Sequence, residues 1–300
     1  MKTVLLYDYE HADTVKVIQD IIERNECEVL AFQTDSSWKA DTVTSPQQLF
    51  RNASHVLFVH SPDPEHEGAL LFYLGYALGR SIRVLVLKTG AEKLIPEHCH
   101  YMVTQLSADT FEEFFQTEKT RFFEEDRKRL ARSYLIEKGI PCFEENFISV
   151  VMAGDSENVE LFLKAGFSTS ITDVRGNPLL SLAVRSQFPE VVTQLVDAHA
   201  NVNHVSLDRG YSPLMDAVQK GDEVICRILL EHGADPDLKS KDGQTALVIA
   251  TGRGDISLCR LLYASGANPD ITDNLGMSAR KYADLFKNAE LTELFNTPRT

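Results

Sequence analysis

A repeat of 33 or 34 residues runs through the second half of the chain and constrains its fold more than any other feature. Four stretches align from residue 173 onward: DVRGNPLLSLAV, LDRGYSPLMDAV, SKDGQTALVIAT and DNLGMSARKYAD. Their glycines follow at spacings of 34, 33 and 33 residues: Gly176, Gly210, Gly243 and Gly276. A second series precedes the first at spacings of 33, 34 and 33: Gly166, His199, Gly233 and Gly266. Two offset series with one period indicate a stack of similar units.

Each unit combines a polar turn, a short apolar helix and a longer amphipathic helix. The short helices are expected to begin near Pro178, Pro213 and Ala246, because proline suits the first turn of a helix. Glycine after the longer helix suits a left-handed cap, so His199 either accepts that strained conformation or ends its helix differently. Four residues share one position on the longer helices: Val159, Val192, Cys226 and Cys259. Both cysteines are therefore predicted to be small core residues.

This pattern resembles the ankyrin repeat, whose period is 33 residues and whose hallmark is a T-P-L-H-x-A stretch. The matching stretches are NPLL at 177–180, SPLM at 212–215 and TALV at 245–248, all without the hallmark histidine. Residues 131–167 form a shortened first unit, which suits an N-terminal cap, and the last unit is a polar C-terminal cap. The resemblance implies an all-α ankyrin-repeat solenoid over residues 139–297, with about three full repeats between its caps.

A solenoid of this kind has no built-in chemistry, and its concave face of turn tips and first helices binds partners. We therefore expect an unknown protein partner on this face, with solvated loops as the alternative interpretation of the tips. Arginine, methionine and exposed leucine are typical of protein-binding surfaces. The expected surface comprises Arg175, Leu207, Arg209, Met215, Lys220, Lys241, Arg253 and Leu275.

The first half alternates apolar, β-rich runs with helical ones over residues 1–108, which indicates an α/β domain with a mostly parallel sheet. Residues 109–138 carry charges of both signs at helical spacing and are expected to form a charged helical connector. Neither a G-x-G-x-x-G pattern nor a P-loop is present, which argues against a dinucleotide-binding or NTPase domain.

The segment SPDPEHEGALLFYLGYALGRSIRVLVLK at 61–88 resembles the nucleoside 2-deoxyribosyltransferase family and, more loosely, the TIR-domain family with its NAD-cleaving members. In the first family a Pro-Asp-rich loop leads into an F-E-x-G-Y-A helix, whose glutamate attacks the anomeric carbon of the sugar. Here that helix reads FYLGYA, so Tyr73 stands in the nucleophile's place, and His100 stands near an expected asparagine. The resemblance implies a flavodoxin/deoxyribosyltransferase-like fold that lacks its nucleophile.

Six residues are candidates for lining a nucleotide or nucleoside pocket: Asp8, His60, Asp63, Glu67, Tyr73 and His100. Asp8 and His60 end apolar runs, where open α/β sheets often meet ligands, although a strand-ending turn explains them as well. Glu67 or Asp63 could replace the missing nucleophile, or these acids simply favour a helix start on a solvated loop. Tyr73 is expected to pack in the core or to line a vestigial pocket.

The net charge is −14, with 30 basic and 44 acidic side chains, which argues against nucleic acid and anionic membranes as partners. The five cysteines are scattered, and no apolar stretch is long enough to span a membrane, so we expect a cytoplasmic protein. The adjacent residues His98, Cys99 and His100 point in different directions, and no partner pair is spaced to complete four ligands, so we expect no metal. No cofactor is expected either. Self-association is left open. The favoured hypothesis is an interaction adaptor with an inactive α/β domain. The alternatives are a nucleotide or nucleoside sensor, and an N-glycosyl hydrolase or transferase that uses Glu67 on nucleosides or NAD.

Overall fold

The structure, a computed structural model, describes residues 1–7, 9–33, 46–59, 67–87 and 103–297. The chain divides into two compact units, residues 1–126 and residues 127–300. Helix α4 (Phe111–Glu137) is a single helix that supplies residues to both units. The expected segments 1–108, 109–138 and 139–297 remain a prediction about domain boundaries.

The first unit is built on a five-stranded sheet in which every strand pair is parallel, as the alternation of strand and helix predicts. The strands are β1 (Lys2–Tyr7), β2 (Glu28–Gln33), β3 (His55–Val59), β4 (Arg83–Leu87) and β5 (Val103–Leu106). Their spatial order is β2-β1-β3-β4-β5. Strand β5 reads VTQL and was not expected from the sequence, because four residues with two polar side chains give no clear strand pattern.

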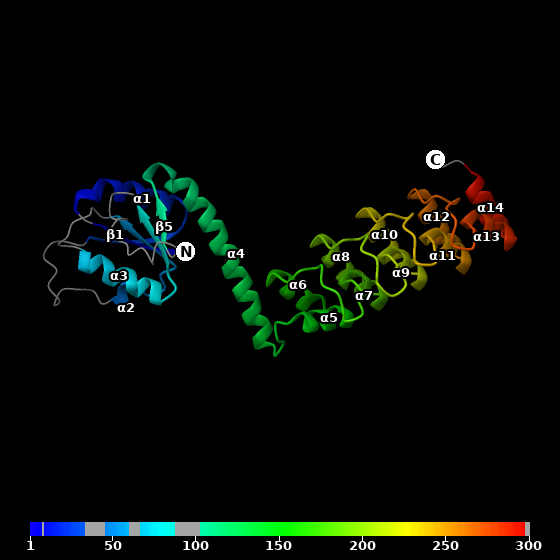
Figure 1. Cartoon of the computed structure of the whole chain (residues 1–300), viewed down its shortest axis with the longest axis horizontal. Coiled ribbons are helices and arrows are strands. Elements are labelled where there is room, and N and C mark those ends of the chain that lie inside the picture. Colours follow the sequence, from blue (N-terminus) through cyan, green and yellow to red (C-terminus); the bar gives the residue numbers. More distant parts are fainter. Residues whose placement is uncertain (8, 34–45, 60–66, 88–102, 298–300) are drawn as a thin grey trace. The chain divides into compact units, whose positions relative to one another are not determined.

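Helices cover both faces of this sheet (Figure 1). Successive side chains of a strand point to opposite faces, so Leu5 packs with α1 (Ala12–Arg24) and the start of α4. Val4 and Leu6 pack instead with α2 (Pro46–Leu49) and α3 (Glu67–Gly79). Two short 3-10 helices precede α1 and α4: η1 (Tyr9–His11) and η4 (Ala108–Thr110).

A buried polar group fastens α4 to the amino ends of β3 and β4. His55 and Glu118 are 2% and 6% exposed, and His55 Nε2 lies 3.3 Å from Glu118 Oε1. Arg83 Nε forms an ion pair with the same oxygen at 2.7 Å. The other ring nitrogen of His55 lies 2.9 Å from the Ser54 hydroxyl. Glu118 therefore contacts His55 and forms an ion pair with Arg83 at a place where an unpaired charge would be costly.

The first unit should lose stability in mild acid because of His55. Burial lowers the pKa of His55, and Glu118 only partly opposes this shift. As pH falls below about 6.5, His55 becomes protonated in the unfolded chain but stays neutral in the folded chain. The free energy of unfolding therefore decreases. Urea unfolding of the first unit at pH 7.5 and pH 5.5 measures this decrease. A His55→Gln variant should lose less stability between the two pH values, and an equal loss would contradict the prediction.

The second unit consists of helix pairs stacked in two rows (Figure 1). The inner row is α5 (Glu144–Ala153), α7 (Leu179–Ser186), α9 (Pro213–Lys220), α11 (Ala246–Arg253) and α13 (Ala279–Leu285). The outer row is α6 (Ser156–Lys164), α8 (Pro189–Asp197), α10 (Glu223–Glu231), α12 (Ile256–Ala264) and α14 (Ala289–Asn296). Buried residues of all these helices form one continuous core, to which α4 adds Ala131 and Leu135. Helix α5 begins five residues after Gly139, so the first unit has a short turn there, as its reduced spacing predicts.

In the first full unit, helix α7 begins one residue later, relative to its proline, than the alignment of Pro178 with Pro213 predicts. Ser212, Thr245 and Ser278 cap α9, α11 and α13 by accepting a backbone hydrogen bond. Pro178 occupies the same capping position before α7 and accepts none with a side chain. Pro178 therefore lies one residue before the place that Pro213 fills, so the letter match of NPLL with SPLM was wrong by one residue.

His199 has a left-handed backbone, with φ of +62°, as do Gly166, Gly233 and Gly266 at the equivalent positions. Its side chain is exposed. Because a side chain in this conformation costs free energy that glycine avoids, His199→Gly should stabilise the second unit by about 0.5–1 kcal/mol. Thermal or urea unfolding measures the change. The control is Glu190→Gly within helix α8, which should destabilise by a similar amount. A loss of stability in both variants would contradict the prediction.

Candidate protein-binding surface on the repeat array

The polar turns that precede α7, α9, α11 and α13 form four fingers. They comprise residues 173–177, 206–211, 240–244 and 273–277. Each finger is closed by a hydrogen bond from the N–H of its first residue to the carbonyl of its last, at 2.9–3.0 Å. The second finger has six residues instead of five. This additional residue accounts for the single spacing of 34 in each glycine series.

Neighbouring fingers are joined by backbone hydrogen bonds. Leu207 N–H donates to Gly176 at 3.3 Å, and Lys241 N–H donates to Arg209 at 3.1 Å. Asn274 N–H continues the series by donating to Asp242 at 3.0 Å. The four tips therefore form one supported ledge.

Exposed apolar and basic side chains lie near one another along these tips. We call the following six residues the finger ledge: Val174, Arg175, Leu207, Arg209, Lys241 and Leu275. Val174, Leu207 and Leu275 are 102%, 69% and 82% exposed, although large aliphatic side chains are normally buried. Five of the six belong to the surface expected from the sequence. An exposed apolar group beside cations is typical of a protein-binding surface.

Met215 does not belong to this surface, so that prediction was wrong. Its side chain is fully buried in the array core. Helix α9 lies between α7 and α11 and is covered by α10, so all residues from Pro213 to Val218 are buried. Lys220 and Arg253 are exposed at the ends of α9 and α11, as expected. Arg253 also donates to the Gln219 carbonyl at 2.7 Å.

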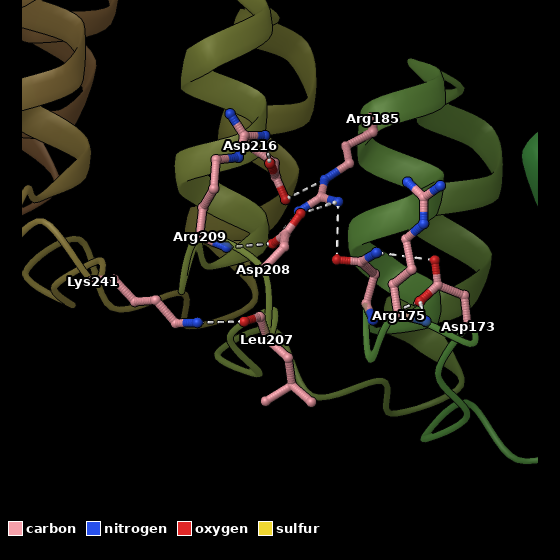
Figure 2. Close-up of polar contacts among 9 residues, drawn as sticks. Asp173, Arg175, Arg185, Leu207, Asp208, Arg209, Asp216 and Lys241 are labelled. Atoms are coloured by element: carbon pink, nitrogen blue, oxygen red, sulfur yellow. Dashed lines mark hydrogen bonds and ion pairs between the residues drawn. The ribbon is translucent and has the colours of Figure 1, made fainter.

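Arg185 connects two neighbouring repeats (Figure 2). From the last turn of α7 its Nε donates to Asp216 Oδ2 of α9 at 2.9 Å. Its Nη1 donates to Asn177 Oδ1 at 3.1 Å and to Asp208 Oδ2 of the second finger at 3.3 Å. Arg209 lies 3.6 Å from the other oxygen of Asp216 and stacks on the Tyr211 ring, 4.5 Å from its centre. The ledge is thus held to the inner helices by charged pairs.

The pKa values of the two carboxylates in this network, Asp208 and Asp216, are shifted in opposite directions. Burial raises the pKa of Asp216, which is 1% exposed, and the two arginines offset only part of this effect. Burial also acts to raise the pKa of Asp208, but hydrogen bonds and the charge of Arg185 outweigh it and lower the pKa to about 2. Asp208 therefore remains a carboxylate at neutral pH, and its charge is matched by Arg185.

Sequence reasoning missed Arg185 and Asp216. Their signal is visible when the inner helices are aligned by their first residues. Asp216 then shares a position with Leu182, Ile249 and Tyr282, so an acid stands where the other units have apolar or aromatic side chains. A charged residue at a core position predicts a partner of opposite charge. The preceding inner helix, α7, has one basic residue, Arg185.

Comparison with known proteins agrees with this architecture. Residues 147–240 match the family described as ankyrin repeats (3 copies), and residues 242–274 match the family described as ankyrin repeat. The chain is 43% identical over 295 residues to an ankyrin repeat-containing protein of Treponema pallidum (strain Nichols), which covers 98% of this chain and 99% of that protein. The chain belongs to this family of ankyrin repeat-containing proteins.

A second relative matches over a short stretch. The 2-5A-dependent ribonuclease of Homo sapiens is 44% identical over 68 residues, which is 23% of this chain and 9% of that enzyme. Because so little of the enzyme is covered, its activity is no guide to the activity of this chain.

The ankyrin repeats bury the two cysteines that the sequence assigned to the core. Cys226 and Cys259 have no exposed surface, like Val159 and Val192 at the equivalent positions. Burial raises the pKa of the Cys226 thiol to about 12 and that of Cys259 to about 11. A thiolate is the reactive form of cysteine, so these residues act as core side chains.

In the α/β unit, four of the six candidate pocket residues lie outside the described residues: Asp8, His60, Asp63 and His100. Glu67 is the first residue of α3, and the structure describes its backbone but not its side chain. Tyr73 is 2% exposed and packs in the core with Leu74 and the edge of the Phe50 ring, 5.8 Å between centres. Burial raises the pKa of the Tyr73 phenol. Among the described residues, Tyr73 is therefore a core side chain.

Over the described residues, no helix is both long and apolar enough to cross a membrane. The same residues contain no cluster of three or more His, Cys, Asp or Glu side chains arranged to hold a metal ion.

Proposed function

We propose that this protein is an interaction adaptor whose ankyrin array binds a partner protein through the finger ledge and the adjoining ends of the inner helices. The observation that carries this proposal is the row of exposed aliphatic and basic side chains on hydrogen-bonded fingers. A preformed surface loses little conformational entropy on binding, and the exposed leucines gain by burial. Ankyrin repeats in general bind protein partners, which supports the proposal.

Affinity capture with the full chain as bait tests this function. The ledge variant is Leu207→Asp/Leu275→Asp, and the matched control is Val224→Asp, which changes an exposed aliphatic residue (58% exposed) on outer helix α10. We expect quantitative mass spectrometry to find proteins retained by the wild type and by the control but lost from the ledge variant. Equal retention by all three baits would contradict the proposal.

The α/β unit is proposed to be an inactive relative of the nucleoside 2-deoxyribosyltransferases. Its strand order is that of flavodoxin-like doubly wound sheets, which supports the proposed fold. The residue at the nucleophile's place is a tyrosine buried in the core, and a phenol with a raised pKa is a poor nucleophile at neutral pH. The strand order reverses between β1 and β3, and sheets of this kind bind ligands at the carboxyl ends of the strands at such a place. Tyr7 and Val59 are register partners at the carboxyl ends of these two strands.

A base-release assay separates the three hypotheses for this unit. The full chain is incubated with NAD and with 2′-deoxynucleosides, beside the variants Glu67→Gln and Tyr73→Phe. We expect no free base from any of them. Release by the wild type that Glu67→Gln abolishes would establish the N-glycosyl enzyme instead. Saturable thermal stabilisation by one of these compounds without release would establish the sensor.

A further inference from the structure

Over the middle of the array, charge differs between the two rows of ankyrin helices. The outer helices α6, α8 and α10 carry six acidic residues against Lys164 and Arg227. Helices α7, α9 and α11 of the inner row contain one acidic residue, Asp216, which is buried and paired with two arginines. Each of these inner helices also has a basic residue at or near its end: Arg185, Lys220 and Arg253. The ends of these three inner helices therefore present basic side chains on a chain whose net charge is −14. In the same row, α5 carries Glu144 and Glu145, and α13 carries Arg280 and Lys281 against Asp284.

The finger tips carry charges of both signs. Asp173 and Asp273 begin their fingers and accept hydrogen bonds from the backbone of the same finger. Arg175, Arg209 and Lys241 are exposed there, together with the carboxylates Asp208 and Asp242. Asp208 is already matched by Arg185, through hydrogen bonds of 3.3 and 3.4 Å. Among the exposed side chains of the fingers and the ends of α7, α9 and α11, five cations outnumber two carboxylates, Asp208 and Asp242. The cations are Arg175, Arg209, Lys241, Lys220 and Arg253. Such a surface attracts an acidic partner.

The aliphatic tips decide which class of acidic partner fits. Val174, Leu207 and Leu275 expose most of their surface beside the cations. Burying them requires apolar side chains on the partner, and a phosphate backbone offers none. The net negative charge of the chain also repels nucleic acid at longer range. A protein segment suits both features of the ledge.

We propose that the finger ledge recognises a protein segment that combines Asp or Glu residues with aliphatic ones. Carboxylates of the segment pair with Arg175, Arg209 and Lys241, while its aliphatic side chains cover Val174, Leu207 and Leu275. This inference rests on the proposed adaptor function and names the chemistry of its partner.

Selection from a displayed library of random 16-residue peptides, with the full chain as target, tests this proposal. We expect the retained peptides to be enriched in Asp and Glu together with Leu, Ile or Val. Their affinity, measured by fluorescence anisotropy, should fall about tenfold between 50 and 300 mM NaCl, because salt screens the exposed charges.

Substitutions of charged residues test whether the peptides bind at the finger ledge. Arg175→Gln/Lys241→Gln should weaken peptide binding about tenfold, and Leu275→Asp should weaken it comparably without removing a cation. The matched control is Lys164→Gln/Arg227→Gln, which removes two cations from the outer helices and should leave the affinity unchanged. Thermal unfolding of each variant verifies that the array is folded.

Three outcomes would overturn the proposal. Retained peptides that are neutral or basic, yet sensitive to Leu275→Asp, would reject the acidic partner and leave the adaptor function in place. No retained peptide, or retained peptides that bind all variants equally, would reject the ledge as a peptide-binding surface and weaken the adaptor function as well. A labelled 20-nucleotide single strand that binds as tightly as the peptides, and is lost with Arg175→Gln/Lys241→Gln, would assign the ledge to nucleic acid.

Discussion

Glu118→Ala is expected to lower the free energy of unfolding of the first unit by about 2–3 kcal/mol. The variant leaves His55 without its buried acceptor and leaves Arg83 without its ion pair, at contacts of 3.3 and 2.7 Å. Removing one member of a buried charged pair typically costs about 3–5 kcal/mol. The Arg83 side chain is 36% exposed and regains part of its hydration, so the expected loss is smaller.

Hydrogen exchange followed by mass spectrometry measures this effect in each unit separately. Protection should decrease in β3, β4 and the first half of α4, while the ankyrin repeats keep theirs. Glu124→Ala is the matched control, because it removes an exposed glutamate from the same helix and should change stability by less than about 0.5 kcal/mol. Similar losses in both variants would show that Glu118 does not hold α4 on the sheet.

Gly154→Ala should destabilise the ankyrin array by about 3 kcal/mol. Gly154 ends α5 in a left-handed conformation, with φ of +74°, and a side chain there costs about 1 kcal/mol by itself. A methyl group at this position would also lie only 2.5 Å from ring carbons of Phe188. Phe188 packs against the array core, so its ring cannot move aside freely.

Gly254 provides a matched control for the backbone contribution. It ends α11 with φ of +70°, and a methyl group there would have no neighbour within 4 Å. Gly254→Ala should therefore cost only about 1 kcal/mol, and urea unfolding of both variants gives the difference. Adding Phe188→Ala should reduce the extra cost of Gly154→Ala, because the clash then disappears. Equal effects of the two glycine substitutions would contradict this explanation.

The repeat period was enough to predict the second half of the fold. It located the two helices of each unit and the shared core position of Val192, Cys226 and Cys259, because a helix with a period of 3.6 residues must bury the same face in every unit. The parallel sheet was predictable for a similar reason, since β1 and β3 are short apolar runs separated by helical ones. Strand β5 was not, because its four residues acquire strand character only by pairing with β4.

The candidate surface was also predictable only in part from the sequence. The exposure of Leu207 and Leu275 followed from their place in a polar turn, where no neighbouring element can cover them. The burial of Met215 followed only from stacking, because inner helix α9 has a helix on either side and α10 behind it, which leaves no face of its first turns in solvent.

The sequence by itself determined the repeating helices, their core faces and the exposed finger tips, because these depend on residues close together in the chain. The tertiary structure alone decided which charges meet. Arg185 and Asp216 are 31 residues apart and belong to different repeats, and only the stacking of α7 on α9 brings them to 2.9 Å. A buried carboxylate must find its partner wherever the fold supplies one, and no local pattern states where that is.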